Sequence, residues 1–150
     1  SVPLSLGKYL IFFSSALELN IIKNIMKNLI IDAAGEKILF KIITEKESYT
    51  SNHLNSRENF DEFVALLFNF LDKNKINLKK LDVIFVNQGP GKFSSIRASL
   101  AAVKALSITG NLEIYGFNSD QIIDQNYNIL LNLLENGELK KNLIKPNYSS

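Results

Sequence analysis

The sequence predicts an α/β domain built on a mixed five-stranded sheet, with elements in the order β-β-β-α-β-α-β. Two short apolar runs and a third, more polar segment with Tyr49 facing inward precede the first long amphipathic segment, which indicates a meander of antiparallel strands before a helix. A strongly apolar run, a Gly-Pro-Gly turn, a helical pattern and a further short apolar run then follow between Leu81 and Gly116. That second pattern is typical of a βαβ unit, whose crossover is right-handed when its strands are parallel.

Composition limits the classes of protein and of site that fit the chain. Its 150 residues suit one domain, and 46% hydrophobic with 21% charged residues is typical of an ordinary globular protein. The 17 basic and 15 acidic residues leave a net charge of +2, too small to favour a nucleic-acid partner by itself. The absence of cysteine excludes disulfides, and a single histidine, His53, without clustered carboxylates predicts no metal site.

Residues 1–25 are expected to be an N-terminal extension, with the compact domain beginning near Met26. The apolar run at 9–17 is shorter than the roughly 20 residues that span a bilayer, and Ser14-Ser15-Ala16 only weakly resembles a signal-peptide cleavage site. The extension is interpreted as an added segment or as upstream sequence in the reading frame, and an amphipathic helix packed on the domain is the alternative. We expect a cytoplasmic protein without membrane contact.

The first three strands are predicted at 28–32, 37–44 and 47–54. The run NLIID at 28–32 is almost continuously apolar, as expected of a central strand covered on both faces, and it ends in Asp32. Asn55-Ser56 offers N-cap side chains for a helix that continues to about Asn74. Further strands are predicted at 81–86 and 112–116.

The first long helix has a broad apolar face, with residues spaced as i, i+3, i+4, i+7, i+8 and i+11. These residues are Phe60, Phe63, Val64, Leu67, Phe68 and Leu71. Leu66 and Phe70 widen the face beyond what packing on a sheet requires, which favours a second surface that a partner covers.

The second long helix is predicted from Ser94 or Ser95 to Thr109, with Gly110 as its C-cap. One side carries Ile96, Leu100, Val103 and Leu106, and another is a small-residue face that permits close approach of a helix. The small residues are Ala98, Ala101, Ala102 and Ala105. The remaining segment, 119–150, is expected to form a helix at 120–135, with Ser119 as its candidate N-cap and Gly137 as its end, and then a tail.

The turn at 88–95, QGPGKFSS, stands between a predicted strand and the start of a helix. Glycines there let backbone N–H groups converge, and the helix N-terminus adds partial positive charge, so the geometry favours an anion. It is not a Walker A loop, because Lys92 is not followed by Ser or Thr. The alternative is a tight turn that needs glycine only to join strand to helix.

Three groups of residues resemble the TsaB (YeaZ) family, in the right order over about residues 27–118. The run VNQGPGKFSSIRASLAAVKAL is similar to that family's R-G-P-G-S-F-T-G-[VI]-R-[IV]-G signature, with Lys92 in place of a serine and Ser95 in place of a glycine. Matching or nearly matching positions are Gly89, Pro90, Gly91, Phe93, Ser94 and Arg97. NLIIDAAGEKI resembles the I-D-T-[AS] strand and hairpin, placing Asp32 at the family's aspartate, and Ser56-Arg57-Glu58 resembles an S-R-E-H helix start, with Asn59 in place of histidine.

The resemblance implies a ribonuclease H-like half-domain of the actin, Hsp70 and sugar-kinase type, with residues 26–118 as the N-terminal lobe. It also implies a non-catalytic, activating subunit for synthesis of threonylcarbamoyladenosine in tRNA, bound through the two helices to a TsaD-type catalytic subunit and to a TsaE-type ATPase. The partner-binding residues would be Phe60, Phe63, Val64, Leu67, Phe70, Ala98, Ala101, Ala102 and Ala105. A homodimer through the same helices is the further expectation, with only indirect contact to tRNA.

The family's second lobe would be missing, because only about thirty residues follow the fifth predicted strand. Two lobes form the family's nucleotide cleft, so no cofactor is expected to be required and no ATP or ADP binding is expected. Two alternatives stay open: a small nucleotide-binding phosphotransferase or degenerate peptidase-like enzyme using Asp32 and the Gly-Pro-Gly turn, and an RNA-contacting module using lysines. Those lysines are Lys73, Lys75, Lys79 and Lys80, with a second group at Lys140, Lys141 and Lys145.

Overall fold

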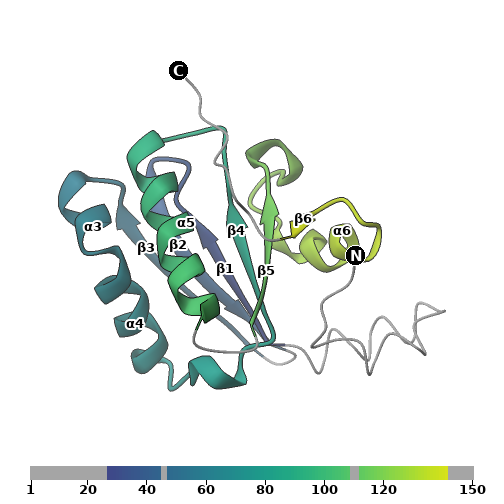
Figure 1. Ribbon diagram of the computed structural model, residues 1–150, viewed down its shortest axis with the longest axis horizontal. Helices are drawn as coiled ribbons and strands as arrows, with labels where there is room; N and C mark the ends of the chain where they lie inside the picture. Colours follow the sequence, from purple (N-terminus) through teal and green to yellow (C-terminus); the bar gives the residue numbers. More distant parts are fainter. Residues whose placement is uncertain (1–26, 45–46, 109–111, 142–150) are drawn as a thin grey trace.

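The computed structural model describes residues 27–44, 47–108 and 112–141, which form a six-stranded mixed sheet with helices on both faces (Figure 1). The strand order is β3-β2-β1-β4-β5-β6. The strands are β1 (Asn28–Asp32), β2 (Lys37–Ile43), β3 (Ser48–Leu54), β4 (Val83–Asn87), β5 (Glu113–Phe117) and β6 (Lys140–Lys141). β1, β4 and β5 are mutually parallel, while β2, β3 and β6 are antiparallel to their neighbours.

The predicted mixed sheet and the β-β-β-α-β-α-β order are confirmed for the first five strands, but the sheet has a sixth strand that the sequence did not predict. β6 has only two residues, both lysines, and it pairs with Tyr115 and Gly116 of β5. Two residues are too few to show a period-2 pattern. The Lys141 ammonium group also lies 3.2 Å from a Glu113 carboxylate oxygen, which supports this pairing across the edge of the sheet.

One face of the sheet is covered by α3 (Arg57–Asp61), α4 (Phe63–Lys73) and α5 (Phe93–Ile108) (Figure 1). Ser56 caps α3 as predicted, its side chain accepting a hydrogen bond from the Asn59 N–H. The single helix predicted to continue to Asn74 is interrupted at Glu62, which has non-helical φ and ψ of −104° and 23°. A short 3₁₀ helix, η2 (Leu78–Lys80), leads into β4.

The opposite face carries the C-terminal elements: the 3₁₀ helices η3 (Ser119–Gln121) and η4 (Tyr127–Ile129), and α6 (Leu130–Glu135). The prediction of one helix at 120–135 is therefore wrong in its first half. Asp124 and Gln125 have positive φ, which interrupts helical geometry before Tyr127. Gly137 ends α6 as predicted, with a φ of 73°.

The side chains of β1 alternate between the two faces of the sheet. Leu29 and Ile31 pack in the core beneath α3, α4 and α5, while Ile30 packs in the core beneath η4 and α6. All three are at most 1% exposed, as expected of a strand covered on both sides.

The predictions for residues 1–25, for the Gly110 C-cap and for the tail beyond Lys141 lie outside the described residues. Within the described ranges, no helix has the length and apolar character needed to cross a membrane.

Candidate functional site

The candidate site is centred on Asp32, which lies at the carboxyl end of β1. β1 and β4 are parallel neighbours, so Asn87 at the end of β4 reaches the same edge of the sheet. The Asn87 side-chain amide donates to Asp32 Oδ1 at 3.0 Å and to the Ser119 hydroxyl oxygen at 3.1 Å. The ends of two strands and the start of η3 are thus joined by side-chain hydrogen bonds.

Tyr127 completes this cluster from the face of the sheet that carries η4 and α6. Its hydroxyl group donates to Asp32 Oδ2 at 2.6 Å, and the Ala34 N–H donates to Asp32 Oδ1 at 3.3 Å. The tyrosine is 6% exposed. Burial, followed by the negative charge of Asp32 and the hydrogen bond to it, raises the pKa of Tyr127 well above its ordinary value.

The donors around Asp32 test whether the residues fit a metal ion. Both carboxylate oxygens accept hydrogen bonds from neutral groups, namely Tyr127, Asn87 and the Ala34 N–H. Tyr127 uses one acceptor site of Oδ2, and the described ranges hold no cluster of His, Cys, Asp or Glu arranged for a metal. Among these residues Asp32 therefore lacks the further ligands that a metal ion needs, and its carboxylate is held by neutral donors.

A cleft of about 690 Å³ opens beside this cluster. It is bounded by the β1–β2 hairpin, the Gly-Pro-Gly turn and the segment from η3 to η4. Its lining residues are Asp32, Ala34, Gly35, Glu36, Lys37, Leu39, Asn52, Asn87, Pro90, Ser119, Ile122, Gln125 and Tyr127. Its size and mixed polarity suit a small polar molecule.

The Gly-Pro-Gly turn is held from several sides by hydrogen bonds within the chain. Gly89 has a φ of 104°, a conformation that favours glycine, and its N–H donates to Asn87 Oδ1 at 2.7 Å. The Lys92 N–H donates to the Ala34 carbonyl oxygen at 2.9 Å. Ser119 donates from its N–H to the Gly89 carbonyl at 3.0 Å and from its hydroxyl to the Pro90 carbonyl at 2.8 Å.

Gly91 makes the close approach between the turn and the β1–β2 hairpin possible. A Cβ atom at this position would lie 2.3 Å from the Ala34 carbonyl oxygen and 2.6 Å from the Ala34 Cβ. Both distances are far below van der Waals contact, so the backbone of the turn can lie here only because residue 91 lacks a side chain.

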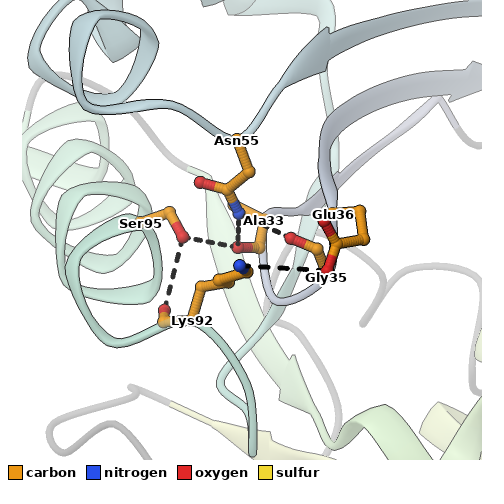
Figure 2. A network of polar contacts seen from close by, with 6 residues as sticks. All are labelled: Ala33, Gly35, Glu36, Asn55, Lys92 and Ser95. Carbon is orange, nitrogen blue, oxygen red and sulfur yellow. Dashed lines mark hydrogen bonds and ion pairs between the residues drawn. The ribbon is translucent and has the colours of Figure 1, made fainter.

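A second set of contacts fixes the start of α5 to the same hairpin (Figure 2). The Ser95 hydroxyl donates to the Ala33 carbonyl oxygen at 2.8 Å. The Asn55 side-chain amide donates to the same oxygen and to the Gly35 carbonyl, both at 2.8 Å. The Lys92 ammonium group lies 3.8 Å from a Glu36 carboxylate oxygen (Figure 2).

The predicted motif residues do not form one cluster. Asp32 and Pro90 line the cleft, and Gly89 and Gly91 form the joint beside it. The remaining members, Lys92, Phe93, Ser94 and Arg97, are exposed, and the Arg97 guanidinium lies 5.3 Å from the centroid of the Phe93 ring. Anion binding at this turn stays a prediction, and two N–H groups that would serve it already donate within the chain.

The predicted partner-binding set needs a correction, because part of it is buried in this chain's own core. Phe63, Leu67, Phe70 and Ala102 are between 0% and 5% exposed, and they pack between the helices and the sheet. The apolar periodicity therefore marks the internal face of α4. Phe60 and Ala98 are half-buried, while Val64, Ala101 and Ala105 are exposed. Only these outward-facing members are available to a partner.

Sequence reasoning missed Asn87, Ser119 and Tyr127. Asn87 could have been found, because a polar residue that follows an apolar strand and precedes a glycine turn lies where strand ends meet. Ser119 was interpreted only as a possible helix cap. Tyr127 carried no usable signal, since its segment was predicted as a regular helix and its approach to Asp32 depends on the positive-φ residues at 124 and 125.

The chain matches a family model and a curated relative. The family model of TsaD, tRNA N6-adenosine threonylcarbamoyltransferase, matches residues 48–129. Over 97 residues the chain is 27% identical to the tRNA threonylcarbamoyladenosine biosynthesis protein TsaB of Buchnera aphidicola subsp. Schizaphis graminum (strain Sg). That match covers 65% of this chain and 46% of the relative, so the chain spans less than half the length of this curated relative.

Two solved structures have the same fold. YeaZ from Pseudomonas aeruginosa matches with a TM-score of 0.57 and 18% identity, over 62% of this chain and 44% of that one. A protein described as similar to the peptidase YEAZ from Pseudomonas aeruginosa matches with the same TM-score, identity and share of this chain, over 43% of its own. The predicted ribonuclease H-like fold is confirmed. Because the family model spans more than half of the chain, the chain belongs to the TsaD family, and the named relatives support its resemblance to the TsaB (YeaZ) proteins.

Proposed function

We propose that this chain is a non-catalytic subunit of the machinery that makes threonylcarbamoyladenosine in tRNA, and that it binds a TsaD-type catalytic subunit. The observation that carries the proposal is the family match over residues 48–129, because that stretch contains both α4 and α5. The name of the curated relative supports the same biosynthetic role. Contact with a TsaE-type ATPase and with tRNA would follow within the assembled complex.

The proposed contact surface is the outer side of α4 and α5, which lie side by side on one face of the sheet (Figure 1). Val64 on α4 is 48% exposed, and Ile108 at the end of α5 is 85% exposed. Ala101 and Ala105 are exposed small residues on the same helix, α5. Small residues beside apolar ones let a helix of a partner approach closely, which supports a helical contact here.

The hydrogen bonding of Asp32 supports a structural role for its carboxylate. Three of its roughly four acceptor sites are used by Tyr127, Asn87 and the Ala34 N–H. These contacts use the carboxylate to hold the C-terminal segment against the strand ends.

Co-expression with a TsaD-type protein, followed by size-exclusion chromatography of the purified complex, tests the proposal. Val64→Glu and Ala101→Glu each place a charge on the proposed surface and should abolish co-elution, while far-ultraviolet circular dichroism stays unchanged. The matched control is Ile123→Glu, which changes an exposed apolar residue in the segment between η3 and η4. Co-elution of both surface variants, or equal loss with the control, would contradict the proposed contact.

A nucleotide-binding enzyme is the second candidate, and the cleft beside Asp32 is the observation that favours it. Glu36 and Lys37 at its rim could contact a polar ligand. Titration calorimetry of the chain with ATP and magnesium separates the two functions. ATP binding that is weakened by Lys37→Gln would favour the nucleotide-binding enzyme. The absence of a binding heat at millimolar ATP would exclude that function.

A further inference from the structure

A cluster of lysines lies in the connection between α4 and β4. The segment from Lys73 to Lys80 has four lysines and no acidic residue. All four are exposed, and none forms an ion pair with another described residue. The lysine patch, defined as Lys73, Lys75, Lys79 and Lys80, is therefore a concentrated positive charge on a protein that is close to neutral overall.

Backbone hydrogen bonds hold this patch in one conformation. Lys75 has a φ of 56°, and its N–H donates to the Asp72 carbonyl at 3.0 Å. The Asn77 side-chain oxygen accepts the Lys79 N–H at 2.9 Å and caps η2. Because the backbone is fixed, binding a ligand would order only the lysine side chains, which lowers the entropic cost of association.

A depression of about 420 Å³, lined by apolar and polar side chains, includes Lys75 of the patch. It is lined by Phe68, Leu71, Asp72, Lys75, Ile76, Asn77 and Leu78. Phe68 is 38% exposed, and it lines this depression together with Lys75. Asp72 is the one acidic lining residue, against four lysines in the patch.

We propose that the lysine patch and Phe68 bind single-stranded RNA. Ammonium groups neutralise phosphates, and an exposed aromatic ring offers a stacking platform for an unpaired base. This pairing of cations with an aromatic ring favours RNA over an acidic protein, which has no flat base to stack. The patch precedes β4, whereas Asn87 ends it, so the RNA site and the Asp32 cleft lie at opposite ends of one strand.

The inference does not rest on the proposed function, and its test needs no TsaD-type protein. Fluorescence anisotropy of a labelled single-stranded RNA is measured with the full chain at several salt concentrations. Four phosphate contacts predict an affinity loss of roughly 50-fold between about 50 and 200 mM salt, from a slope of about 0.7 per contact. The variant K73Q/K75Q/K79Q/K80Q should bind weakly and show almost no salt dependence.

Phe68→Leu tests the stacking contact separately from charge. It keeps an apolar side chain at the position but removes the aromatic face. Affinity should fall by roughly 5-fold or more at every salt concentration, while the salt slope stays that of the unchanged chain. An unchanged affinity would overturn the stacking contact, and a changed slope would show that Phe68 acts by positioning the lysines.

A charge-matched control guards against a nonspecific effect of net charge. It replaces four basic residues outside the patch with glutamine: Lys37, Lys41, Arg57 and Lys104. This control should retain the affinity and slope of the unchanged chain. Three results would each overturn the proposal. The control variant could lose as much RNA affinity as the lysine variant, or polyglutamate could displace the labelled RNA as well as unlabelled RNA does. The third is that the lysine variant loses binding to anionic vesicles but keeps its affinity for RNA.

Discussion

At the scale of single residues, the contact between Tyr127 and Asp32 joins two segments that are far apart in the sequence. The tyrosine is buried, and its hydroxyl group donates a hydrogen bond to Asp32 Oδ2 at 2.6 Å. Tyr127→Phe removes this donor but keeps the ring that packs against Phe117. We expect a loss of about 1.5 to 3 kcal/mol in the free energy of unfolding, measured by urea denaturation near neutral pH.

The same tyrosine predicts a dependence of stability on alkaline pH. Its pKa in the folded chain is raised above the ordinary value of 10.0, chiefly by burial and then by the Asp32 charge. Above about pH 10 the unfolded chain therefore loses the phenolic proton more readily than the folded one, and stability falls as pH rises. Tyr127→Phe lacks this group, so the difference in stability between the two proteins should narrow above pH 10. A constant difference from pH 8 to pH 11 would contradict this prediction.

Two glycines with different surroundings provide a matched pair of substitutions. Gly91→Ala would put a Cβ atom 2.3 Å from the Ala34 carbonyl oxygen, so the turn must shift and its hydrogen bond from Lys92 to Ala34 is weakened. We expect a loss of about 1 to 3 kcal/mol in the free energy of unfolding. At Gly35 a Cβ atom meets no heavy atom within 4 Å and φ is not positive, so Gly35→Ala should be neutral or slightly stabilising. Thermal denaturation of both variants checks the contrast.

Some of the site could be predicted from single residues, and the reason differs from residue to residue. The Gly-Pro-Gly turn was identified because local sequence specifies a turn between a strand and a helix, and Asp32 was identified through the resemblance of its strand and hairpin to those of a known family. Tyr127 was not identified, because the position of its hydroxyl depends on how a whole segment folds back over the sheet. Contacts across 95 positions have no local signal in a single sequence.

At the scale of elements, one carbonyl oxygen links the β1–β2 hairpin to two helices. The Ala33 carbonyl accepts from Ser95 at the start of α5 and from Asn55 just before α3 (Figure 2). Ser95→Ala or Asn55→Ala alone leaves one donor, so each should cost about 1 kcal/mol or somewhat more. Together they leave a buried carbonyl without either donor, and the double variant should lose about 1 kcal/mol more than the sum. Urea denaturation of the four proteins measures this coupling, and strict additivity would contradict the shared-acceptor account.

The positions of the long helices were predicted well, but the residues that they expose were not. Spacing at i, i+3 and i+4 identifies a helix and its apolar face, and α4 and α5 are both present. The width of that face does not tell which residues the chain's own sheet covers. Phe63 and Leu67 were assigned to a partner surface, yet the sheet beneath α4 buries them. Exposure at Val64 could be known only once the helix was placed.

At the scale of the whole molecule, the three candidate binding surfaces lie on different parts of the domain. The cleft is at the carboxyl ends of β1 and β4, the lysine patch precedes β4, and the outer side of α4 and α5 lies over one face. Substitutions in one surface need not disturb the others, because each uses exposed side chains on separate elements. Loss of RNA binding and loss of protein binding can therefore be separated by variants.

The outer side of α4 and α5 also predicts self-association in the absence of a partner. Exposed apolar and small residues on two adjacent helices can be buried by a second copy through the same surface, which is the usual geometry of a symmetric dimer. Sedimentation velocity should show a concentration-dependent dimer that Ala101→Glu converts to monomer, while Ile123→Glu leaves it unchanged. Because a dimer and a complex with a TsaD-type protein would bury the same residues, adding that protein should dissociate the dimer. A dimer that persists in the complex, or that Ala101→Glu does not affect, would place self-association on another surface.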